Sequence, residues 1–489
     1  NEGVYFALLK KGANPRFETR LGKNALVASF APDNSEMLEL IYHSLGSVRD
    51  EESIITGATP LIHALNSPYC MEAVPTLLRL GENIEHETRD SRTALIAAAL
   101  SGVTDRVALC LRNGAKANQE TRTGATAMSA VIKKLGMPIQ MATEESYQDD
   151  INGENVLKFL LTNAIDKANV NHENKNGVTL SMFAARAFSN NPRVLALLLD
   201  HGADKNVESS KGSTLLLDAL QFGCDDAVDL LIVEGVDVNY ETRKNTAEVL
   251  TPLILAAKRG SVFQIEQLLA AGADINYETK AGETALMAAV SASRADHVSA
   301  LMSIGNADAN YEVKHGKTKG DTAIVLAGRL GHKDVIQRLI SSHNVDPSRG
   351  LSDKTTPLIR AVVDEDADAV KHMLLAGVPI NVESAEGYTP LVEAAKKPSR
   401  MRCLEALCDF DASIVDFETS RGFSALHEAC KVGNEEAVLA MCLKYGANSN
   451  RESARDATTP LMTAAEYGQV TVVETLIKKC SADVNRETV

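Results

Sequence analysis

Two kinds of apolar run alternate along the chain, and a polar segment follows every second run. The first kind begins at a Thr and is rich in Ala and Leu, as in 284–290 (TALMAAV). The second kind has apolar residues at positions i, i+3 and i+4, as in 265–269 (IEQLL), which is the spacing of one helix face. A Gly such as Gly272 ends the second run, and the polar segment 273–282 follows. The pattern predicts a unit of helix, turn, helix and projecting hairpin.

The Thr that begins the first helix recurs at a nearly constant interval, which indicates a repeat. Eleven of the twelve intervals lie between 33 and 38 residues, and the remaining one is 53. At such a position a side-chain oxygen can accept a hydrogen bond from a free N–H of the first helical turn. We expect a single array of about thirteen repeats over 1–489, with a partial first repeat at 1–20 and the last one at 459–489. The positions are Asn24, Thr59, Thr93, Thr126, Thr179, Thr214, Thr251, Thr284, Thr322, Thr356, Thr389, Ser424 and Thr459.

The second helices are expected to end at a Gly, because a left-handed residue ends many helices and Gly adopts that conformation without strain. Nine units carry this residue: Gly12, Gly81, Gly114, Gly202, Gly235, Gly272, Gly305, Gly377 and Gly446.

The 53-residue interval holds an acidic insertion at 137–153. Glu144, Glu145, Asp149 and Asp150 lie there, between the two expected helices of that repeat. We expect this acidic insertion to form a mobile loop.

The motif G-x-T-P-L-x-x-A-A…LL…G-A-D-x-N resembles the ankyrin repeat, and it is nearly intact in 387–391 and 272–276. The resemblance covers nearly the whole chain. It implies an all-α ankyrin-repeat solenoid of stacked helix-turn-helix units with projecting β-hairpin loops. It also implies a protein-binding scaffold that uses the hairpin tips and the inner helices. The His that usually follows Thr-Pro-Leu in this family occurs here only as His427, which we expect to be a hydrogen-bonded structural residue.

Charge and composition narrow the function. With 50 Lys and Arg against 65 Asp and Glu the net charge is −15, which is the wrong sign for a protein that grips nucleic acid. No apolar run approaches the roughly 20 residues that cross a bilayer, so we expect no membrane insertion. The eight Cys lack disulfide or metal spacing and predict reduced thiols in the cytoplasm. The chain begins without Met and ends within a motif, so we expect it to be an excerpt of a longer protein.

No motif for catalysis, cofactor binding or metal binding is found. HExxH, Cys-x-x-Cys and Gly-x-Ser-x-Gly are all absent, so we expect no catalytic residue, no cofactor and no metal. The tail of a phosphate-binding loop occurs at 316–318, but the required earlier Gly is replaced by Tyr311, which favours a basic hairpin insertion with Lys314, Lys317 and Lys319.

A second basic cluster, at 396–402, lies beside Pro398 in a turn between helices. We favour a solvated loop over a site for an acidic partner. Its basic members are Lys396, Lys397, Arg400 and Arg402.

The expected hairpins carry a Glu at one fixed position, followed in most units by Thr or Ser. We call these residues the hairpin Glu residues. The structural interpretation is that the hydroxyl braces its own hairpin and that a Lys or Arg two residues past the Glu pairs across repeats. The functional one is a periodic docking edge for an elongated partner, and recent duplication is a third explanation. We favour the structural one. The set is Glu18, Glu87, Glu120, Glu173, Glu208, Glu241, Glu278, Glu312, Glu383, Glu418, Glu452 and Glu487.

Three adjacent repeats carry a Tyr immediately before the hairpin Glu. Tyr is enriched at binding hot spots, because it combines a large area with a polar tip. Packing between repeats explains the position equally well. The candidate partner-binding residues are Tyr240, Tyr277, Tyr311, Glu241, Glu278 and Glu312.

These features together predict a non-enzymatic interaction scaffold that binds protein partners, with the regular edge lying along a filament or another large assembly. We expect it in the cytoplasm, associated with the cytoskeleton. The alternative is a targeting or substrate-recognition arm of a larger enzyme, such as a kinase or ubiquitin ligase, whose catalytic domain lies outside this segment.

Overall fold

Helices joined by turns and hairpins make up the part of the chain that the computed structural model describes. That part comprises residues 2–19, 24–30, 35–45, 51–67, 70–135, 144–163, 169–187, 192–243, 250–316, 319–341, 346 and 349–486. These ranges contain no β-strand, and a single isolated bridge joins Glu418 to Ser424 in one hairpin. None of the helices in these ranges combines the length and the apolar character that crossing a membrane requires.

The chain divides into two compact units. The first unit comprises residues 1–237 with 242–245, and the second comprises 238–241 with 246–489. The first unit holds α1 (Glu2–Lys10), α2 (Ala25–Ala28), α3 (Ser35–Ser44), α4 (Pro60–Asn66), α5 (Ala73–Arg79), α6 (Ala94–Leu100), α7 (Thr104–Arg112), α8 (Ala127–Leu135), α9 (Glu144–Asn163), α10 (Leu180–Ala187), α11 (Arg193–Asp200), α12 (Leu215–Gln221) and α13 (Asp225–Val233).

The second unit continues the same alternation of first and second helices, with two short 3₁₀ helices (η1, η2) and one π-helical turn (η3) added. It holds α14 (Pro252–Arg259), α15 (Val262–Ala270), α16 (Ala285–Ser291), α17 (Ala295–Ser303), α18 (Ala323–Leu330), α19 (Lys333–Ser341), α20 (Pro357–Val363), α21 (Ala367–Leu375), α22 (Pro390–Ala395), η1 (Pro398–Arg400), α23 (Met401–Phe410), η2 (Ala412–Asp416), α24 (Ala425–Val432), α25 (Glu435–Leu439), η3 (Ala440–Lys444), α26 (Pro460–Glu466) and α27 (Val470–Lys479).

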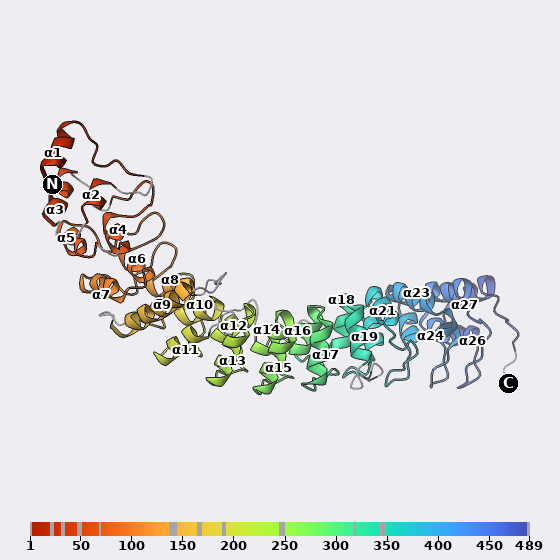
Figure 1. Cartoon of the computed structure of the whole chain (residues 1–489). Coiled ribbons are helices and arrows are strands. Elements are labelled where there is room, and N and C mark those ends of the chain that lie inside the picture. The colour runs from red at the N-terminus through yellow and green to blue at the C-terminus, as the bar shows by residue number, and fades with distance from the viewer. Residues whose placement is uncertain are drawn as a thin grey trace. The chain divides into compact units, whose positions relative to one another are not determined.

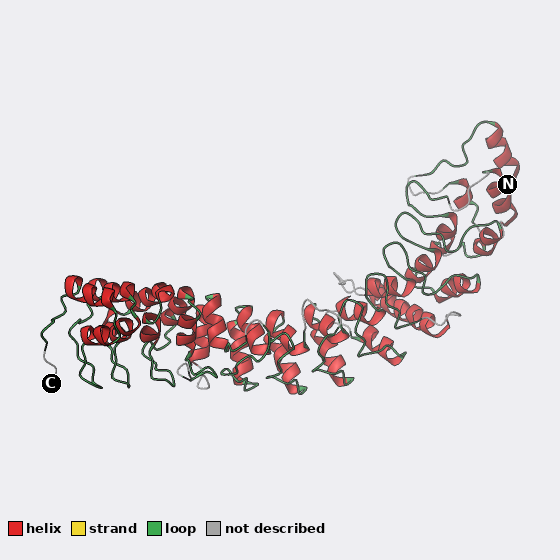
Figure 2. Ribbon diagram, turned by 180° about the vertical axis from the view of Figure 1, so that it is seen from behind, coloured by secondary structure: helices red, strands yellow, loops and turns green. Residues whose placement is uncertain are grey.

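After α1, the helices of the described residues form thirteen pairs, one pair for each predicted repeat. Within a pair the two helices pack on each other, as α6 does on α7, and first helices of neighbouring repeats also pack, as α14 does on α16 (Figure 1). In the C-terminal part of the second unit the hairpin loops project from one side of the helix stack (Figure 2). Each unit is therefore a stack of helix-turn-helix layers with hairpins along one side.

Small side chains allow the close approach of the first helices. Leu286, Ala288 and Ala289 on α16 are all buried, and the two Ala are fully inaccessible. Six of the eight Cys are also buried as free thiols, and the other two are half-buried. The interior is made mainly of Ala, Leu, Ile and Val.

The predicted N-caps are confirmed at eleven of the thirteen positions, where the side-chain oxygen accepts a hydrogen bond from the N–H three residues on. The exceptions are Thr322 and Ser424. The Thr322 hydroxyl is buried and has no hydrogen-bond partner among the described residues. Ser424 Oγ instead pairs with His427 Nδ1 at 2.8 Å.

Eight of the nine predicted terminal glycines have a positive φ, and Gly305 is the exception. The left-handed residue there is Asn306, with φ 53°. A Cβ on Gly305 would lie 2.0 Å from Ile275 Cδ1, so this Gly is required for close packing against the preceding hairpin and not for its backbone angle. The prediction that Gly305 is the left-handed residue that ends this helix was therefore wrong.

The acidic insertion is not a loop over its described part, which corrects the prediction for 137–153. Residues 136–143 lie outside the described residues, but α9 begins at Glu144 and continues to Asn163. Gly153 lies inside α9, where a Cβ would meet Leu135 Cδ2 at 2.7 Å, so close packing on α8 explains this Gly.

Candidate interaction surface

Several hairpins are braced by the hydroxyl that follows their Glu. The N–H of Thr279 donates to the carbonyl of Glu283 at 3.0 Å, and the N–H of Glu283 donates to Thr279 Oγ1 at 3.1 Å. Thr279 is fully buried. This confirms the predicted bracing role of the hydroxyl, and the same side-chain bond occurs at Thr88, Thr121, Ser209 and Ser384.

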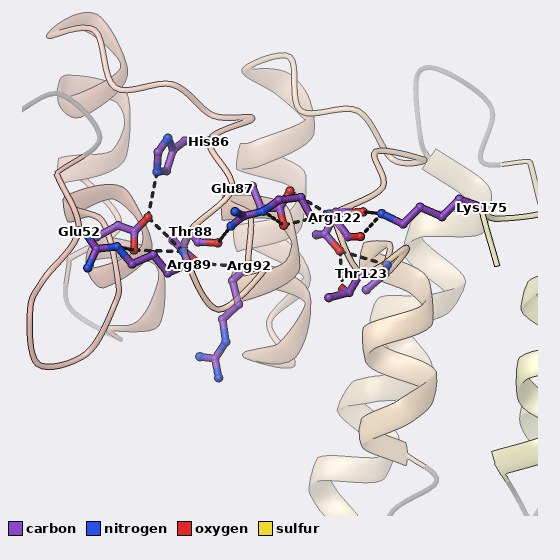
Figure 3. A network of polar contacts seen from close by, with 11 residues as sticks. Glu52, His86, Glu87, Thr88, Arg89, Arg92, Arg122, Thr123 and Lys175 are labelled. Carbon is purple, nitrogen blue, oxygen red and sulfur yellow. Dashed lines mark hydrogen bonds and ion pairs between the residues drawn. The ribbon is translucent and has the colours of Figure 1, made fainter.

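The hairpin Glu residues bind the next hairpin through its backbone. The carboxylates of ten of the twelve, and of Glu52, accept a hydrogen bond from the N–H of the residue two places past the Glu position of the following repeat. Glu487, and the position two places past it that would donate to Glu452, lie outside the described residues. Glu87 accepts the N–H of Arg122 at 2.9 Å, and Glu52 accepts that of Arg89 at 3.1 Å (Figure 3). We call this series of contacts the carboxylate ladder. The accepting residues are Glu18, Glu52, Glu87, Glu120, Glu173, Glu208, Glu241, Glu278, Glu312, Glu383 and Glu418.

The donor of the ladder is the main chain, whereas a Lys or Arg side chain was predicted. Arg122 also brings its Nε within 3.1 Å of Glu87, and Arg89 Nε lies 3.7 Å from Glu52. Ser352 occupies the same place in its hairpin, and its N–H donates to Glu312 at 2.8 Å. A basic side chain is therefore an addition to the contact and not its basis.

One contact of the carboxylate ladder, that of Glu52, was not predicted from the sequence, and at one other position a backbone hydrogen bond replaces the Glu. Glu52 lies 34 residues after Glu18 and is followed by Ser53, so the repeat interval and the Glu-Ser pair were the available signal. The hairpin at 346–356 has Gly350 at the Glu position. There the N–H of Ala385 donates to the carbonyl of Lys354 at 3.3 Å.

The candidate tyrosines are part of the carboxylate ladder. The Tyr277 hydroxyl donates to Glu241 Oε2 at 2.5 Å, and the Tyr311 hydroxyl donates to Glu278 Oε2 at 2.7 Å. The hydrogen bond to Glu241, together with burial, raises the pKa of Tyr277 to about 12. Burial and the bond to Glu278 raise the pKa of Tyr311 to about 12. Tyr240 is half-buried.

Of the six candidate contact residues, the structure therefore brings four together as two Tyr–Glu pairs. Glu312 contacts the hairpin of Ser352, and its carboxylate accepts a hydrogen bond from the Ser352 hydroxyl at 2.6 Å as well as one from the Ser352 N–H. The polar atoms of these residues are engaged within the array. Their role in binding a partner stays a prediction.

Glu278 shows the electrostatics of a rung most clearly. Its side chain is only 6% exposed, and it accepts the Tyr311 hydroxyl and the N–H groups of Lys314 and His315. Burial disfavours the charged carboxylate, but these hydrogen bonds outweigh burial and lower the pKa of Glu278 below its ordinary value. The carboxylate is therefore held in its charged form.

A groove of about 670 Å³ lies in the first unit, between the hairpins and the first helices α6, α8 and α10. Its apolar lining includes Ile96, Met128 and Phe183, and the basic side chains of Arg92 and Lys133 also line it. This groove has no signature in the sequence, because its lining residues come from several repeats and do not recur at fixed motif positions.

The two basic segments differ from their predictions in part. The hairpin at Lys314 is longer than most of the others, because the N–H of Val313 donates to the carbonyl of Asp321, eight residues on. This confirms the predicted hairpin insertion. Lys317 lies outside the described residues. The predicted solvated loop at 396–402 is wrong for Arg400, which lies in η1, is 4% exposed and pairs with Glu393 at 2.6 Å.

The rest of that basic cluster divides into paired and exposed members. Lys396 also pairs with Glu393, at 2.6 Å, so this half-buried carboxylate contacts both cations. Lys397 and Arg402 remain exposed.

His427 is a structural residue, as predicted. It is 1% exposed, its Nδ1 pairs with Ser424 Oγ, and its Nε2 lies 3.1 Å from the carbonyl of Thr458 in the next hairpin. Burial lowers the pKa of His427, which keeps the ring neutral. Across the described ranges, no cluster of three or more His, Cys, Asp or Glu has the arrangement of a metal site.

Comparison with known proteins agrees with this geometry. The profile of the family described as ankyrin repeats (3 copies) matches residues 148–242, 218–314, 358–453 and 415–488, which together exceed half of the chain. The chain belongs to the ankyrin repeat family. The repeats described above, with their paired helices and braced hairpins, are thus ankyrin repeats.

Several curated ankyrin-repeat relatives are similar to part of the chain. B-cell lymphoma 3 protein homolog of Mus musculus is 31% identical over 176 residues, which is 34% of this chain and 38% of that protein. Ankyrin repeat and SOCS box protein 6 of Homo sapiens is 32% identical over 207 residues, 41% of this chain and 48% of that protein. Tyrosine-protein kinase Shark of Drosophila melanogaster is 34% identical over 126 residues, which is 26% of this chain and 13% of that protein. The match covers less than half of each relative.

Among solved structures, the ankyrin repeat domain of Bcl-3, a member of the IkappaB protein family, is similar at 24% identity. The match covers 47% of this chain and 98% of that domain, with a TM-score of 0.36.

Proposed function

We propose that this ankyrin-repeat chain is a non-enzymatic scaffold that binds a protein partner through its hairpin tips and its inner face, the face formed by hairpins and first helices. The carboxylate ladder is the observation that carries the proposal. Because neighbouring hairpins within a unit are bonded to each other, the tips of each unit form a fixed row, and little conformational entropy is lost when a partner binds.

The exposed groups at the tips are the ones available to a partner. In the repeat of Tyr277 these are Lys280 and Ala281, which are exposed, whereas the carboxylate of Glu278 is directed into the array. The stripe of Tyr240, Tyr277 and Tyr311 stays part of the proposed contact through its ring faces, since the hydroxyls of Tyr277 and Tyr311 are already bonded.

We place the scaffold in the cytoplasm, along a filament or another large assembly. The free state of all eight thiols supports a reducing compartment, and the regular spacing of the tips supports an elongated partner.

A second candidate function is the recognition arm of a larger enzyme. Relatives of this chain include a tyrosine-protein kinase and a protein with a SOCS box, and the chain matches only part of each. Reading the complete open reading frame decides between the two, because a kinase glycine loop or a zinc-ligand pattern outside these repeats supports the recognition arm.

The scaffold is tested by placing a photo-reactive benzoylphenylalanine at Ala281 on a hairpin tip or, as the matched control, at Ala270 on the exposed end of α15 in the same region. After illumination in cells, cross-linked proteins are identified by mass spectrometry. We expect partners to be captured from position 281 and not from position 270. Equal capture from both positions, or none from either, contradicts binding through the tips.

A further inference from the structure

The groove of the first unit combines an apolar lining with basic side chains. Met128 on α8 and Ile96 on α6 are buried, and Phe183 on α10 is half-buried where it lines the groove. The single acidic residue in the lining is Asp90, against Arg92, Lys133 and Arg186. This basic excess contrasts with the net charge of −15 of the whole chain.

Two of the three cations are available to a ligand. Arg186 is occupied, because its guanidinium donates to Asp218 at 3.0 Å and 3.2 Å. Arg92 and Lys133 are exposed, and their side chains form no hydrogen bond or ion pair with a described residue. In Figure 3 the Arg92 guanidinium points away from the carboxylate ladder, whereas Arg122 joins it. Set against the carboxylate of Asp90, these two cations leave the groove with a small net positive charge.

The size of the groove fits a short extended segment. Its floor comes from the first helices α6, α8 and α10 of three consecutive repeats. Three layers at roughly 8–10 Å each give a length of about 25 Å. An extended chain rises about 3.3 Å per residue, so about eight residues fit.

We infer that this groove binds an extended acidic peptide whose alternate side chains are apolar. Successive side chains of an extended chain point to opposite faces, so apolar residues contact Met128 and Phe183 while Asp or Glu residues reach Arg92 and Lys133. The inference rests on the proposed scaffold function and names the partner chemistry at one site. An acidic protein segment is favoured over nucleic acid, because the lining is largely apolar and two cations are few for a phosphate backbone.

The test uses the whole chain and a fluorescein-labelled peptide of four Glu-Leu pairs, followed by fluorescence anisotropy. Peptides of four Lys-Leu and four Gln-Leu pairs and a single-stranded RNA of similar length are compared. The double variant Arg92→Glu with Lys133→Glu reverses the two available charges. Its matched control, Arg112→Glu with Lys158→Glu, makes the same charge change at exposed positions of α7 and α9 outside the groove.

We expect the Glu-Leu peptide to bind, and the groove double variant to weaken its binding by about tenfold or more, because lost attraction is replaced by repulsion. The control variant should stay within about twofold. Ala130→Glu on α8, which lines the groove and is half-buried, should weaken binding similarly by filling it. Circular dichroism checks that each variant keeps its helices.

The inference is overturned if the Gln-Leu peptide or the RNA binds as well as the Glu-Leu peptide, or if the control variant weakens binding as much as the groove variant. Cross-linking of partners from position 281 without any peptide binding refutes the groove assignment and leaves the scaffold in place. If neither cross-linking from position 281 nor peptide binding is observed, the proposed scaffold function is refuted as well.

Discussion

At the scale of the residue, the side chains of the hairpin gain their roles from the neighbouring repeat. Glu278 would be an ordinary surface carboxylate in an isolated repeat, but in the array it accepts hydrogen bonds from Tyr311, Lys314 and His315. Hydrogen bonds to charged groups contribute about 1.5–3 kcal/mol each, which is more than an exposed ion pair gives. Hydrogen bonds to these carboxylates therefore contribute to the free energy of association between neighbouring hairpins.

The lowered pKa of Glu278 makes a prediction for pH. The unfolded chain, with its pKa near 4.5, binds the proton more readily than the folded one. Stability that comes from this residue is therefore complete above pH 4.5 and is lost as pH falls through the folded pKa. Glu278→Gln should lower the melting temperature at pH 7, and the difference from the unmodified chain should shrink toward pH 3.

The matched control for this pH series is Glu283→Gln. Glu283 lies five residues away in the same hairpin and forms a single ion pair with Lys258 at 3.5 Å. Scanning calorimetry across pH should show a smaller effect of this change at pH 7. A Glu278→Gln effect that does not diminish on acidification refutes the charged rung.

At the scale of the element, most of the architecture follows from the sequence, since local rules decide it. A Thr or Ser before an apolar run marks a helix start, and a Gly after the second run marks its end. What the sequence could not predict depends on contacts between repeats. Gly305 is needed because of Ile275, and α9 extends to Glu144 through a region whose acidic composition suggested a loop.

The candidate site was predictable only in part for the same reason. The recurring hairpin Glu positions were visible as a pattern, but their acceptor role depends on the main chain of the next hairpin. The groove of Met128 and Phe183 arises from tertiary packing across repeats, which has no local signature.

Hairpin packing makes a prediction about two glycines of neighbouring elements. Gly272 and Gly282 have nearly the same φ, 87° and 82°. A Cβ on Gly272 would meet nothing within 4 Å, whereas one on Gly282 would lie 2.1 Å from the carbonyl oxygen of His315. Gly272→Ala should cost about 1–2 kcal/mol of backbone strain. Gly282→Ala should cost several kcal/mol more, since it also separates two hairpins.

Amide hydrogen exchange of the two variants, resolved by peptide, measures these local costs. Equal loss of protection in both variants would show that the hairpins are not in close contact. The comparison separates the conformational cost of a side chain at positive φ from the cost of the clash with the next repeat.

At the scale of the whole molecule, each unit behaves as a linear array whose stability is a sum of repeat terms and neighbour terms. The carboxylate ladder contributes a neighbour term of the same kind in both units, from Glu18 in the first to Glu418 in the second. Within each unit the hairpin row is therefore ordered by the same kind of contact in most repeats. The hairpin with Gly350 is the exception, because a backbone bond to Lys354 replaces the carboxylate there.

The most direct test of this account is amide hydrogen exchange, measured by NMR, at the residues that donate to the ladder. The N–H groups of Arg122, Lys314 and Ser420 lie in exposed hairpins, yet each is bonded to a Glu of the preceding repeat. We predict slow exchange at all three, and rapid exchange at Lys314 alone in Glu278→Ala. Rapid exchange at these amides in the unmodified chain would contradict the carboxylate ladder.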